Sequence, residues 1–234
     1  MPIMAPAPTA EAITRTREKS TDTVYQALRE KILSNELRPG TQMLEQELVQ
    51  LFGVSRTPVR EALIRLQNEH LVQIVPRHGV RVRNVSMTDI EEVFQVQTSL
   101  EATAASTVAA RKPGARELKA LEKACTEMER AFAKNDREAW SAAREAFYAR
   151  LVEMSDNPRL TQIVGECSDQ VRRVRELTLR LIDPDESQAR DLHAIIDALR
   201  QGDVSAAQAL CRENRARNLQ MQIEALQRFR ILDV

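Results

Sequence analysis

The feature that most constrains this sequence is the long helical pattern that runs from about residue 86 through the rest of the chain. Apolar residues recur there at helical spacing between short breaks containing Pro, Gly, Asp or Asn, such as Lys112-Pro113-Gly114. Helices are expected over residues 88–111, 114–134, 136–155, 158–182, 185–201 and 203–230. Only 3% of the residues are aromatic and six are glycine, which disfavours turn-rich β folds. This part of the chain is therefore predicted to pack as a single all-α bundle.

Residues 21–83 show a different pattern, in which helices precede a β-hairpin. Thr21-Asp22-Thr23 provides helix caps before an amphipathic segment that Pro39-Gly40 terminates. Shorter helices are expected over 44–51 and 56–69. The β-rich stretches 71–75 and 80–85 follow, separated by a Pro- and Gly-containing turn. Three helices and a two-stranded ribbon make a small domain, so the chain is expected to contain two.

The expected boundaries are a disordered arm at 1–20, a first domain at 21–83, a linker at 84–88 and an all-α domain at 89–234. The arm starts Pro- and Ala-rich and lacks the basic segment of a signal peptide. No apolar stretch is long enough to span a membrane, so a cytoplasmic protein is predicted. Cys125, Cys167 and Cys211 lack metal-ligand spacing and are interpreted as free buried thiols.

The segment 56–69 is predicted to be a helix with two distinct faces. Its apolar stripe contains Val59, Ala62, Leu63 and Leu66. Thr57 and Arg60 lie on the opposite side, with Arg56 at the margin. An Arg-bearing helix suits the major groove of DNA, where guanidinium groups bind guanine edges, and its N-terminus and hydroxyl groups suit phosphate. The alternative is a surface helix with incidental arginines.

Charge is distributed unevenly along the chain. The stretch Ala12–Val85 holds 12 Lys and Arg against 8 Asp and Glu, whereas Ser86–Val234 holds 22 against 25. Between Ser55 and Arg83 there are six arginines: Arg56, Arg60, Arg65, Arg77, Arg81 and Arg83. A basic patch on a neutral protein fits a surface that faces phosphates, although an ordinary solvated face is the alternative.

The run from Leu28 to Val82 resembles the winged helix-turn-helix of GntR-family regulators. The similarity rests on Pro39-Gly40, the segment GVSRTPVREAL at residues 53–63 and Gly79, although His70 stands where the family often has glycine. The resemblance implies contacts of Arg56 and Arg60 with bases or backbone, of Ser55 and Thr57 with phosphate, and of the wing with the minor groove. The expected DNA-binding set is Ser55, Arg56, Thr57, Arg60, Arg65, Arg77, His78 and Gly79.

The helical part resembles the FCD effector domain of FadR-type GntR regulators. The matching segments are 93–105, 147–160 and 193–207. The fold class predicted is therefore mainly α, with an N-terminal winged helix-turn-helix and a C-terminal FCD-like bundle. Many family members hold a divalent metal with one Asp and three His in this bundle. The resemblance places Arg144, Tyr148, His193 and Asn214 at those positions, and Gln97 where the family usually has Arg.

This set of residues does not suit a metal, because one histidine remains and Arg144 repels cations. We therefore predict neither a metal nor another cofactor. An inward-facing Arg144 is instead expected to hold an organic acid directly, with Tyr148, His193, Asn214 and Gln97 completing an effector pocket. The alternative is that Glu101 or Glu166 pairs with Arg144 and the pocket is vestigial.

The function predicted is that of a homodimeric regulator, a repressor by expectation, that binds a palindromic double-stranded DNA operator and answers an organic-acid effector. Two alternatives remain open from the sequence. The helical domain acts only in dimerisation, or it is an enzyme in which Tyr148 and His193 perform acid–base chemistry. The sequence lacks a nucleophile–base pair and a phosphate-binding glycine loop, which disfavours the enzyme.

Overall fold

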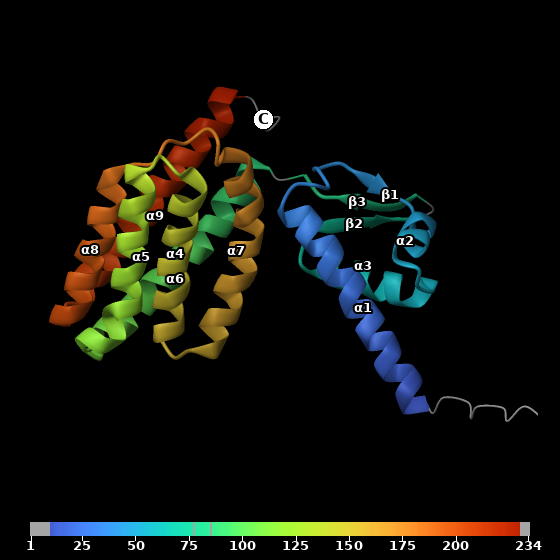
Figure 1. Cartoon of the computed structure of the whole chain (residues 1–234), viewed down its shortest axis with the longest axis horizontal. Coiled ribbons are helices and arrows are strands. Elements are labelled where there is room, and N and C mark those ends of the chain that lie inside the picture. Colours follow the sequence, from blue (N-terminus) through green and yellow to red (C-terminus); the bar gives the residue numbers. More distant parts are fainter. Residues whose placement is uncertain (1–9, 77, 85, 230–234) are drawn as a thin grey trace, which may run out of the picture. The chain divides into compact units, whose positions relative to one another are not determined.

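The computed structural model describes the backbone of residues 10–76, 78–84 and 86–229, and the side chains of all of these except residues 10–17 and 229. The chain divides into two compact units, Met1–Asn84 and Val85–Val234, which are described separately (Figure 1). None of the helices over the described residues is both long enough and apolar enough to cross a membrane.

The first unit combines a helical layer with a small antiparallel sheet. The helices are α1 (Ala10–Leu33), α2 (Glu45–Phe52) and α3 (Arg56–Asn68), and the strands are β1 (Gln42–Met43), β2 (Val72–Val75) and β3 (Gly79–Val82). The sheet order is β1-β3-β2, with Ile74 opposite Val80. The predicted stripe of α3 is fully buried against α1, so that pattern is confirmed.

Two elements of this unit differ from the expectation. Helix α1 begins at Ala10, so residues 10–20 are helical and do not belong to a disordered arm. The sequence Ala10–Ser20 contains no Pro or Gly and is rich in helix-forming Ala, Glu, Arg and Lys, which explains the extension past the Thr21–Thr23 caps. Strand β1 was not expected, because two residues show no alternation that a sequence pattern can detect.

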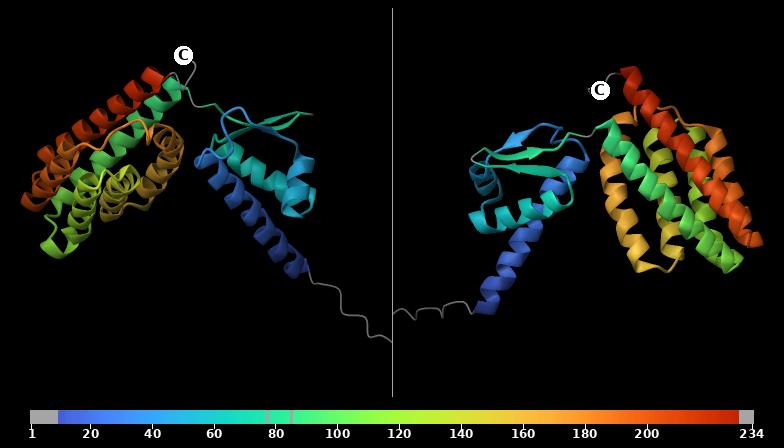
Figure 2. Two further views of the ribbon diagram at one scale, coloured as in Figure 1. Left: turned by 45° about the horizontal axis from the view of Figure 1, so that its top comes forward. Right: turned by 180° about the vertical axis from the view of Figure 1, so that it is seen from behind.

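The second unit is a helical bundle whose helices agree closely with the predicted ones. They are α4 (Met87–Ala110), α5 (Ala115–Ala133), α6 (Arg137–Met154), α7 (Pro158–Thr178), α8 (Glu186–Gln201) and α9 (Val204–Phe229). Ser86 caps α4 through the backbone N–H of Asp89, so the expected linker ends there. Figure 2 shows α9 running back along α4, and these two long helices pack closely.

The interior of the bundle is partly polar, which distinguishes it from the apolar interior of the first unit. An apolar core gathers residues from α4, α5, α6, α8 and α9, including Phe147, Leu151 and Ile195. Beside it lie buried polar side chains: Gln97, Glu101, Ser141, Arg144, Arg173, Thr178, Gln188, Asn214, Arg215, Asn218 and Gln222. Burying charged groups costs free energy unless they are paired, so this layer is the place to look for a site.

The cysteine prediction is confirmed. Cys125, Cys167 and Cys211 are free and buried in the bundle. Burial raises the pKa of Cys125 and of Cys211 to about 12. Since the thiolate is the reactive form, these thiols are inert near neutral pH.

Candidate functional site

The turn before α3 presents the N-terminal end of that helix to solvent. Gly53 ends α2 in the left-handed conformation, with φ 61°, and Ser55 begins α3 in extended backbone. The Ser55 side chain makes no capping hydrogen bond. Ser55, Arg56 and Thr57 are all exposed. The hydroxyl groups, the guanidinium and the positive end of the helix dipole therefore face outward together, an arrangement suited to phosphate.

Arg60 extends this surface one turn further along α3. Its side chain is 63% exposed, and its Nε lies 2.8 Å from Glu45 Oε2 on α2. A groove of about 470 Å³ runs between α2, α3 and the β2–β3 hairpin, and Arg56, Arg60 and Gly79 contribute to its lining. An exposed ion pair of this kind contributes little to stability, so Arg60 can exchange Glu45 for a base or phosphate at small cost.

The hairpin tip is held by strand β1. Gln42 Nε2 donates to the His78 carbonyl at 2.7 Å, and the His78 side chain is exposed. Gly79 has φ 84°, and a Cβ there would lie 2.2 Å from the Met43 carbonyl oxygen. Glycine at this position is therefore required by the neighbouring strand, independently of any approach to DNA. Arg77, the first residue of the expected wing tip, lies outside the described residues.

Arg65 occupies a different place from the other expected DNA-binding residues. Its guanidinium pairs with Asp22 and lies 3.9 Å from the centre of the Tyr25 ring, both on α1. The hydrogen bond to Asp22 raises the pKa of Arg65. The contacts of this side chain connect α3 to α1. Arg65 is therefore not part of the exposed N-terminal end of α3, which Ser55, Arg56, Thr57 and Arg60 form and which is called the reading end below.

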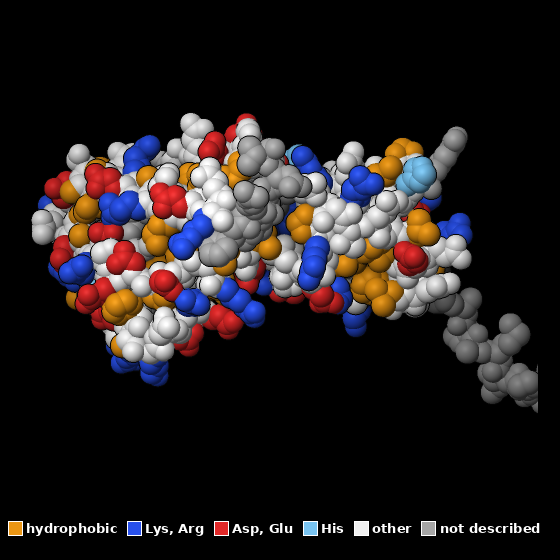
Figure 3. Space-filling view, turned by 90° about the horizontal axis from the view of Figure 1, so that it is seen from above, with side chains coloured by type: hydrophobic (Ala, Val, Ile, Leu, Met, Phe, Trp, Pro, Cys, Tyr) orange, Lys and Arg blue, Asp and Glu red, His pale blue; other side chains and the backbone are white. Residues whose placement is uncertain are grey.

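The two units also differ in the balance of basic and acidic side chains on their surfaces. Figure 3 shows basic and acidic groups mixed over the helical unit, whereas on this face of the smaller unit the basic groups outnumber the acidic ones.

In the helical unit, a buried ion pair joins α4 to α9. Arg215 Nε donates to Glu101 Oε2 at 2.6 Å, and its Nη2 donates to the other carboxylate oxygen. The same guanidinium lies 3.6 Å from the centre of the Tyr148 ring, and Tyr148 donates its phenolic hydrogen to Asn214 Oδ1 at 2.7 Å. Tyr148 and Asn214 thus meet, as expected, but they are bonded to each other.

Glu145 is the centre of a second charged group. Its carboxylate oxygens lie 3.1 Å from Arg175, 3.5 Å from Arg144 and 3.6 Å from Arg215. Burial acts to raise the pKa of Glu145, but Arg215, Arg175 and Arg144 more than offset it and hold the pKa at about 2. The carboxylate is therefore ionised at all physiological pH values and partly neutralises three guanidiniums.

Arg144 is the least well compensated of those three. It is 3% exposed, and its contacts with Gln188 Oε1 at 3.4 Å and Glu145 Oε1 at 3.5 Å are long. Burial lowers the pKa of the Arg144 guanidinium. The carboxylates considered from the sequence as its partners are engaged elsewhere: Glu101 binds Arg215, and Glu166 accepts from Gln162. Arg144 is thus a buried cation in weak contacts.

Gln97 reaches the edge of this network through Glu101, whereas His193 does not join it. Gln97 is buried and donates to Glu101 Oε1 at 3.0 Å and to Ser168 Oγ at 3.1 Å. His193 points elsewhere, with its side chain 44% exposed and its Nε2 2.9 Å from Glu129 Oε1. Of the expected effector residues, the charged network connects Arg144 with Tyr148 and Asn214, while Gln97 lies beyond Glu101 and His193 faces α5.

The four positions that hold a metal in related domains do not fit a divalent cation here. They present a guanidinium, a neutral phenol, an amide and an outward imidazole. Burial keeps the pKa of Tyr148 well above its usual value, so it offers no phenolate. Divalent first-row metals require several neutral imidazole or anionic ligands. Over the described residues, no group of three His, Cys, Asp or Glu side chains gathers.

A small cavity adjoins Arg144 between α6, α7 and α9. Arg137, Trp140, Ser141 and Arg144 line it from α6, Arg175 and Thr178 from α7, and Asn218 and Gln222 from α9. Leu179 and Ile182, from the segment after α7, also line it. Its free volume is about 20 Å³, enough for one water molecule. Sequence reasoning missed Trp140 and Gln222; the single tryptophan one helical turn before Arg144 was the available signal for the first, and Gln222 had none.

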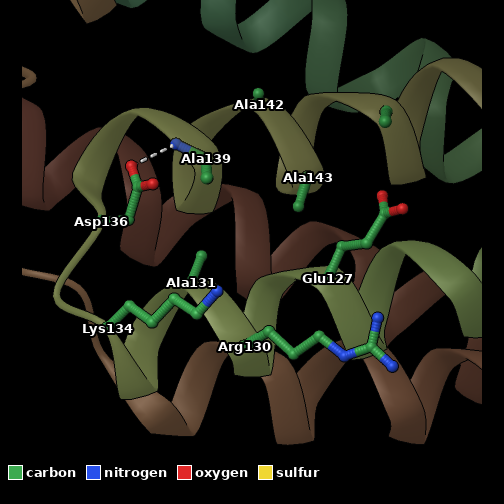
Figure 4. A pocket seen from close by; sticks show the side chains of 9 residues that line it. Glu127, Arg130, Ala131, Lys134, Asp136, Ala139, Ala142 and Ala143 are labelled. Atoms are coloured by element: carbon green, nitrogen blue, oxygen red, sulfur yellow. Dashed lines mark hydrogen bonds between the residues drawn. The ribbon is translucent and has the colours of Figure 1, made fainter.

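A larger groove lies between α5 and α6 and has a different character. It encloses about 440 Å³ and is floored by alanines, with Glu127, Arg130, Lys134 and Asp136 at its edge (Figure 4). Asp136 already accepts from the Ala139 N–H as the cap of α6. Among the described residues, none of the buried polar atoms without a partner belongs to this groove. Its charged side chains are exposed at the edge of the groove.

Comparison with protein families assigns both units. Residues 20–82 match the family described as bacterial regulatory proteins, gntR family, and residues 92–216 match the FCD domain. The chain belongs to the GntR family. The two matches together cover the helix-turn-helix with its wing and most of the bundle, so the fold class predicted from the sequence is confirmed. A GntR regulator with an FCD domain is a DNA-binding transcriptional regulator with a helical effector-binding domain.

Individual GntR proteins agree with this assignment. An uncharacterised HTH-type transcriptional regulator of Agrobacterium vitis is 42% identical over 130 residues, covering 55% of this chain and 76% of that protein. The HTH-type transcriptional repressor RspR of Escherichia coli is 26% identical over 192 residues, covering 79% and 81% of the two chains. The solved structure of E. coli McbR/YncC superimposes with a TM-score of 0.71 at 21% identity, covering 88% of this chain and 97% of that one, and shows the same fold.

The GntR assignment also bears on the enzyme alternative. That alternative depended on Tyr148 and His193 acting together, but Tyr148 donates to Asn214 and His193 contacts Glu129. The two side chains are therefore not arranged as an acid–base pair.

Proposed function

We propose that this regulator is a repressor that binds a palindromic operator as a homodimer, and that a small organic acid in the helical domain weakens that binding. The proposal rests on two features that occur together in this chain. The reading end of α3 is exposed and basic, and Arg144 in the bundle is buried and weakly compensated. One surface is suited to DNA phosphates and bases, and one interior position is suited to an anion. The protein would act on the chromosome, in the cytoplasm.

In the DNA complex, the proposed roles follow the geometry of the reading end. Arg56 and Arg60 contact base edges in the major groove, and Ser55 and Thr57 bind phosphate at the α3 N-terminus. His78 and Gly79, with Arg77, follow the minor groove from the hairpin. Arg65 contributes through the α1–α3 contact, since its guanidinium is held by Asp22 and Tyr25. A dimer presents two such reading ends to two half-sites, which requires operator symmetry.

The effector proposal rests on the electrostatics of the polar layer. Glu145 is shared among three guanidiniums. Arg215 also binds Glu101, whereas Glu145, at 3.5 Å, is the one carboxylate in contact with Arg144 among the described residues. An anion at Arg144 would add the missing negative charge, with Tyr148 and Asn214 behind it as the polar wall. Release of DNA follows if the anion binds more tightly to the arrangement with low DNA affinity. RspR is named a repressor, which agrees with this sense of regulation.

The test is operator binding by fluorescence anisotropy, using a site selected from random duplexes with the full-length protein. The expected site is an inverted repeat bound by two chains, with stoichiometry measured by analytical ultracentrifugation, and an organic acid from a screen raises the Kd. A site without symmetry, or one chain per site, would contradict the dimer.

A second candidate is a bundle that only dimerises, which the small volume of the Arg144 cavity favours. Operator binding indifferent to every acid screened would support it over the effector proposal.

A further inference from the structure

Helix α2 begins with two acidic side chains that make different contacts. Glu47 accepts from the backbone N–H of Leu44 at 2.8 Å and so caps its own helix. Glu45 instead reaches across to α3, where its Oε2 lies 2.8 Å from Arg60 Nε. Because Glu47 already satisfies the N-terminus of α2, the contact between Glu45 and Arg60 calls for a different explanation.

The atom through which Arg60 binds Glu45 decides what the rest of the side chain can do. A guanidinium is planar and carries five N–H donors, one on Nε and four on the two terminal nitrogens. Over the described residues, the bond from Nε to Glu45 is the one hydrogen bond that the Arg60 side chain makes. The terminal nitrogens Nη1 and Nη2 therefore keep the pair of donors that matches O6 and N7 of guanine.

The pair lies on the surface that is proposed to meet DNA. Both side chains line the groove between α2, α3 and the β2–β3 hairpin. The Arg60 side chain is 63% exposed and that of Glu45 is 28% exposed. An exposed arginine loses rotamer freedom when it binds a partner, and a contact at Nε restricts the side chain before DNA arrives. Less entropy is then lost when the terminal nitrogens bind a base.

A carboxylate in this groove also changes which part of DNA the arginine favours. Glu45 is repelled by phosphates and offsets the charge of Arg60, so the pair is only weakly attracted to the phosphate chain. Recognition of a base edge depends more on the placement of two donors than on net charge. Pairing should therefore lower affinity for DNA of any sequence while preserving affinity for guanine.

We infer that Glu45 is a positioning residue for base recognition by the reading end. It holds Arg60 through Nε, directs Nη1 and Nη2 toward a guanine and reduces the attraction of the same side chain to phosphate. An exposed ion pair can open at small cost, but reading a base in this way does not require it to open. The inference rests on the proposed role of Arg60 in the major groove.

The competing explanation is an ordinary surface ion pair, which contributes little to stability and has no part in DNA recognition. The two explanations differ in what removal of the carboxylate does. An ordinary pair predicts that the preference for the operator over other DNA stays the same. A positioning residue predicts that affinity for unrelated DNA rises while the preference for the operator falls.

The experiment measures this preference by fluorescence anisotropy on the selected operator and on a duplex of the same composition in scrambled order. E45A is expected to bind the scrambled duplex about threefold more tightly and to lose about tenfold of its preference for the operator. E45Q should show the same gain on scrambled DNA, but its amide oxygen still accepts from Nε and should preserve most of the preference.

The matched control is E36Q, which removes a carboxylate that is 62% exposed and pairs with Lys31 in the same unit. It should leave the preference for the operator unchanged. The inference is overturned if E45A keeps the wild-type preference, or if E45Q loses the preference as fully as E45A does. Thermal midpoints close to that of wild type verify that the variants fold.

A second measurement identifies the base that the pair reads. Each operator base pair is replaced in turn, and the loss of affinity is measured for wild type, E45A and R60A. Both variants are expected to lose discrimination at the same G·C pair of each half-site, and E45A/R60A should discriminate no less than R60A alone. A uniform loss of discrimination at all positions would show a general loosening of the unit and would overturn the inference.

The same data separate this inference from the proposed role of Arg60. If R60A keeps wild-type discrimination at every position, the role of Arg60 in reading a base fails, and the inference fails with it. If R60A loses discrimination at one base pair and E45A does not, the inference alone fails.

Discussion

The two units of this regulator differ in where their functional charged side chains lie, on the surface in one unit and in the interior in the other. The first unit has an apolar core, and its reading-end residues Arg56 and Arg60 lie on the surface. The helical unit buries Arg144, Arg215 and Glu101 among its helices. Exposed charges cost little to maintain and are available to a large partner such as DNA, whereas buried charges must be compensated inside the fold. Under the proposed function, the exposed charges of the first unit contact DNA and the buried charges of the helical unit bind a small anion.

The largest expected effect comes from removing the two exposed arginines of α3. Since each good guanidinium contact contributes about 1–3 kcal/mol, R56A and R60A should each weaken operator binding about 10- to 100-fold, and the double variant more. Stability should be nearly unchanged, because these side chains are exposed. Anisotropy titrations at several salt concentrations measure both affinity and the number of phosphate contacts. R150A is the control, and an R56A/R60A protein that binds like wild type would contradict the reading end.

The next largest effect concerns how Glu145 neutralises the buried guanidiniums inside the bundle. E145Q leaves Arg144, Arg175 and Arg215 without their shared carboxylate, so it should destabilise the protein by on the order of 3 kcal/mol at pH 7. R144M should be neutral or slightly stabilising, since it removes the excess cation. Chemical denaturation of the three proteins measures this contrast.

The pH dependence of the E145Q effect has a definite direction. The folded pKa of Glu145 is about 2, below its ordinary value near 4.5. Its stabilising contribution is therefore complete above the ordinary value and is lost as pH falls toward 2. The difference in unfolding free energy between wild type and E145Q should be constant from pH 7 to about 5 and shrink below that. A difference that grows on acidification would refute the assigned role of Glu145.

A smaller effect is expected at His70 in the first unit. His70 follows α3 with φ 58°, the left-handed conformation that glycine adopts readily, and its ring bonds Arg83 at 3.0 Å. H70G relieves backbone strain of about 1 kcal/mol but loses that contact and adds chain entropy, so a gain of up to about 1 kcal/mol is expected. The measurement is the thermal midpoint of operator-free protein, with N68G, at an exposed helical position, as a destabilising control.

The smallest expected effect is that of metal removal. Chelation followed by elemental analysis should find well below one equivalent of Zn or Mn per chain, and the thermal midpoint should not change. The physical reason is the donor set, which offers one outward imidazole and a buried guanidinium. Stoichiometric metal that survives dialysis would contradict the prediction and revive the family's usual site.

Local signals in the sequence predicted most of the secondary structure, because they are properties of neighbouring residues. The stripe of α3 and the breaks between helices, such as Lys112-Pro113-Gly114, are examples. The misses have the same origin. Two-residue β1 has too few residues to show a pattern, and α1 extends through residues 10–20 because no helix breaker stands there.

The candidate site was predictable only in part, since it depends on which side chains meet. The substitution of Arg144 for a metal ligand was visible in the sequence through family resemblance. Glu145 and Trp140 lie beside Arg144 on α6, but Gln222 reaches the same region from α9, far along the chain, and no sequence signal connects it with them.

The sequence by itself determined the family, the two-domain arrangement of helices and hairpin, and the loss of the metal ligands. Tertiary structure alone decided that His193 faces Glu129, that Tyr148 bonds Asn214 and that Gly79 is required by Met43. It also decided that unpartnered donors gather around Arg144. The physical reason is that helix formation depends on short-range spacing, whereas compensation of a buried charge depends on the atoms that packing brings within hydrogen-bonding distance.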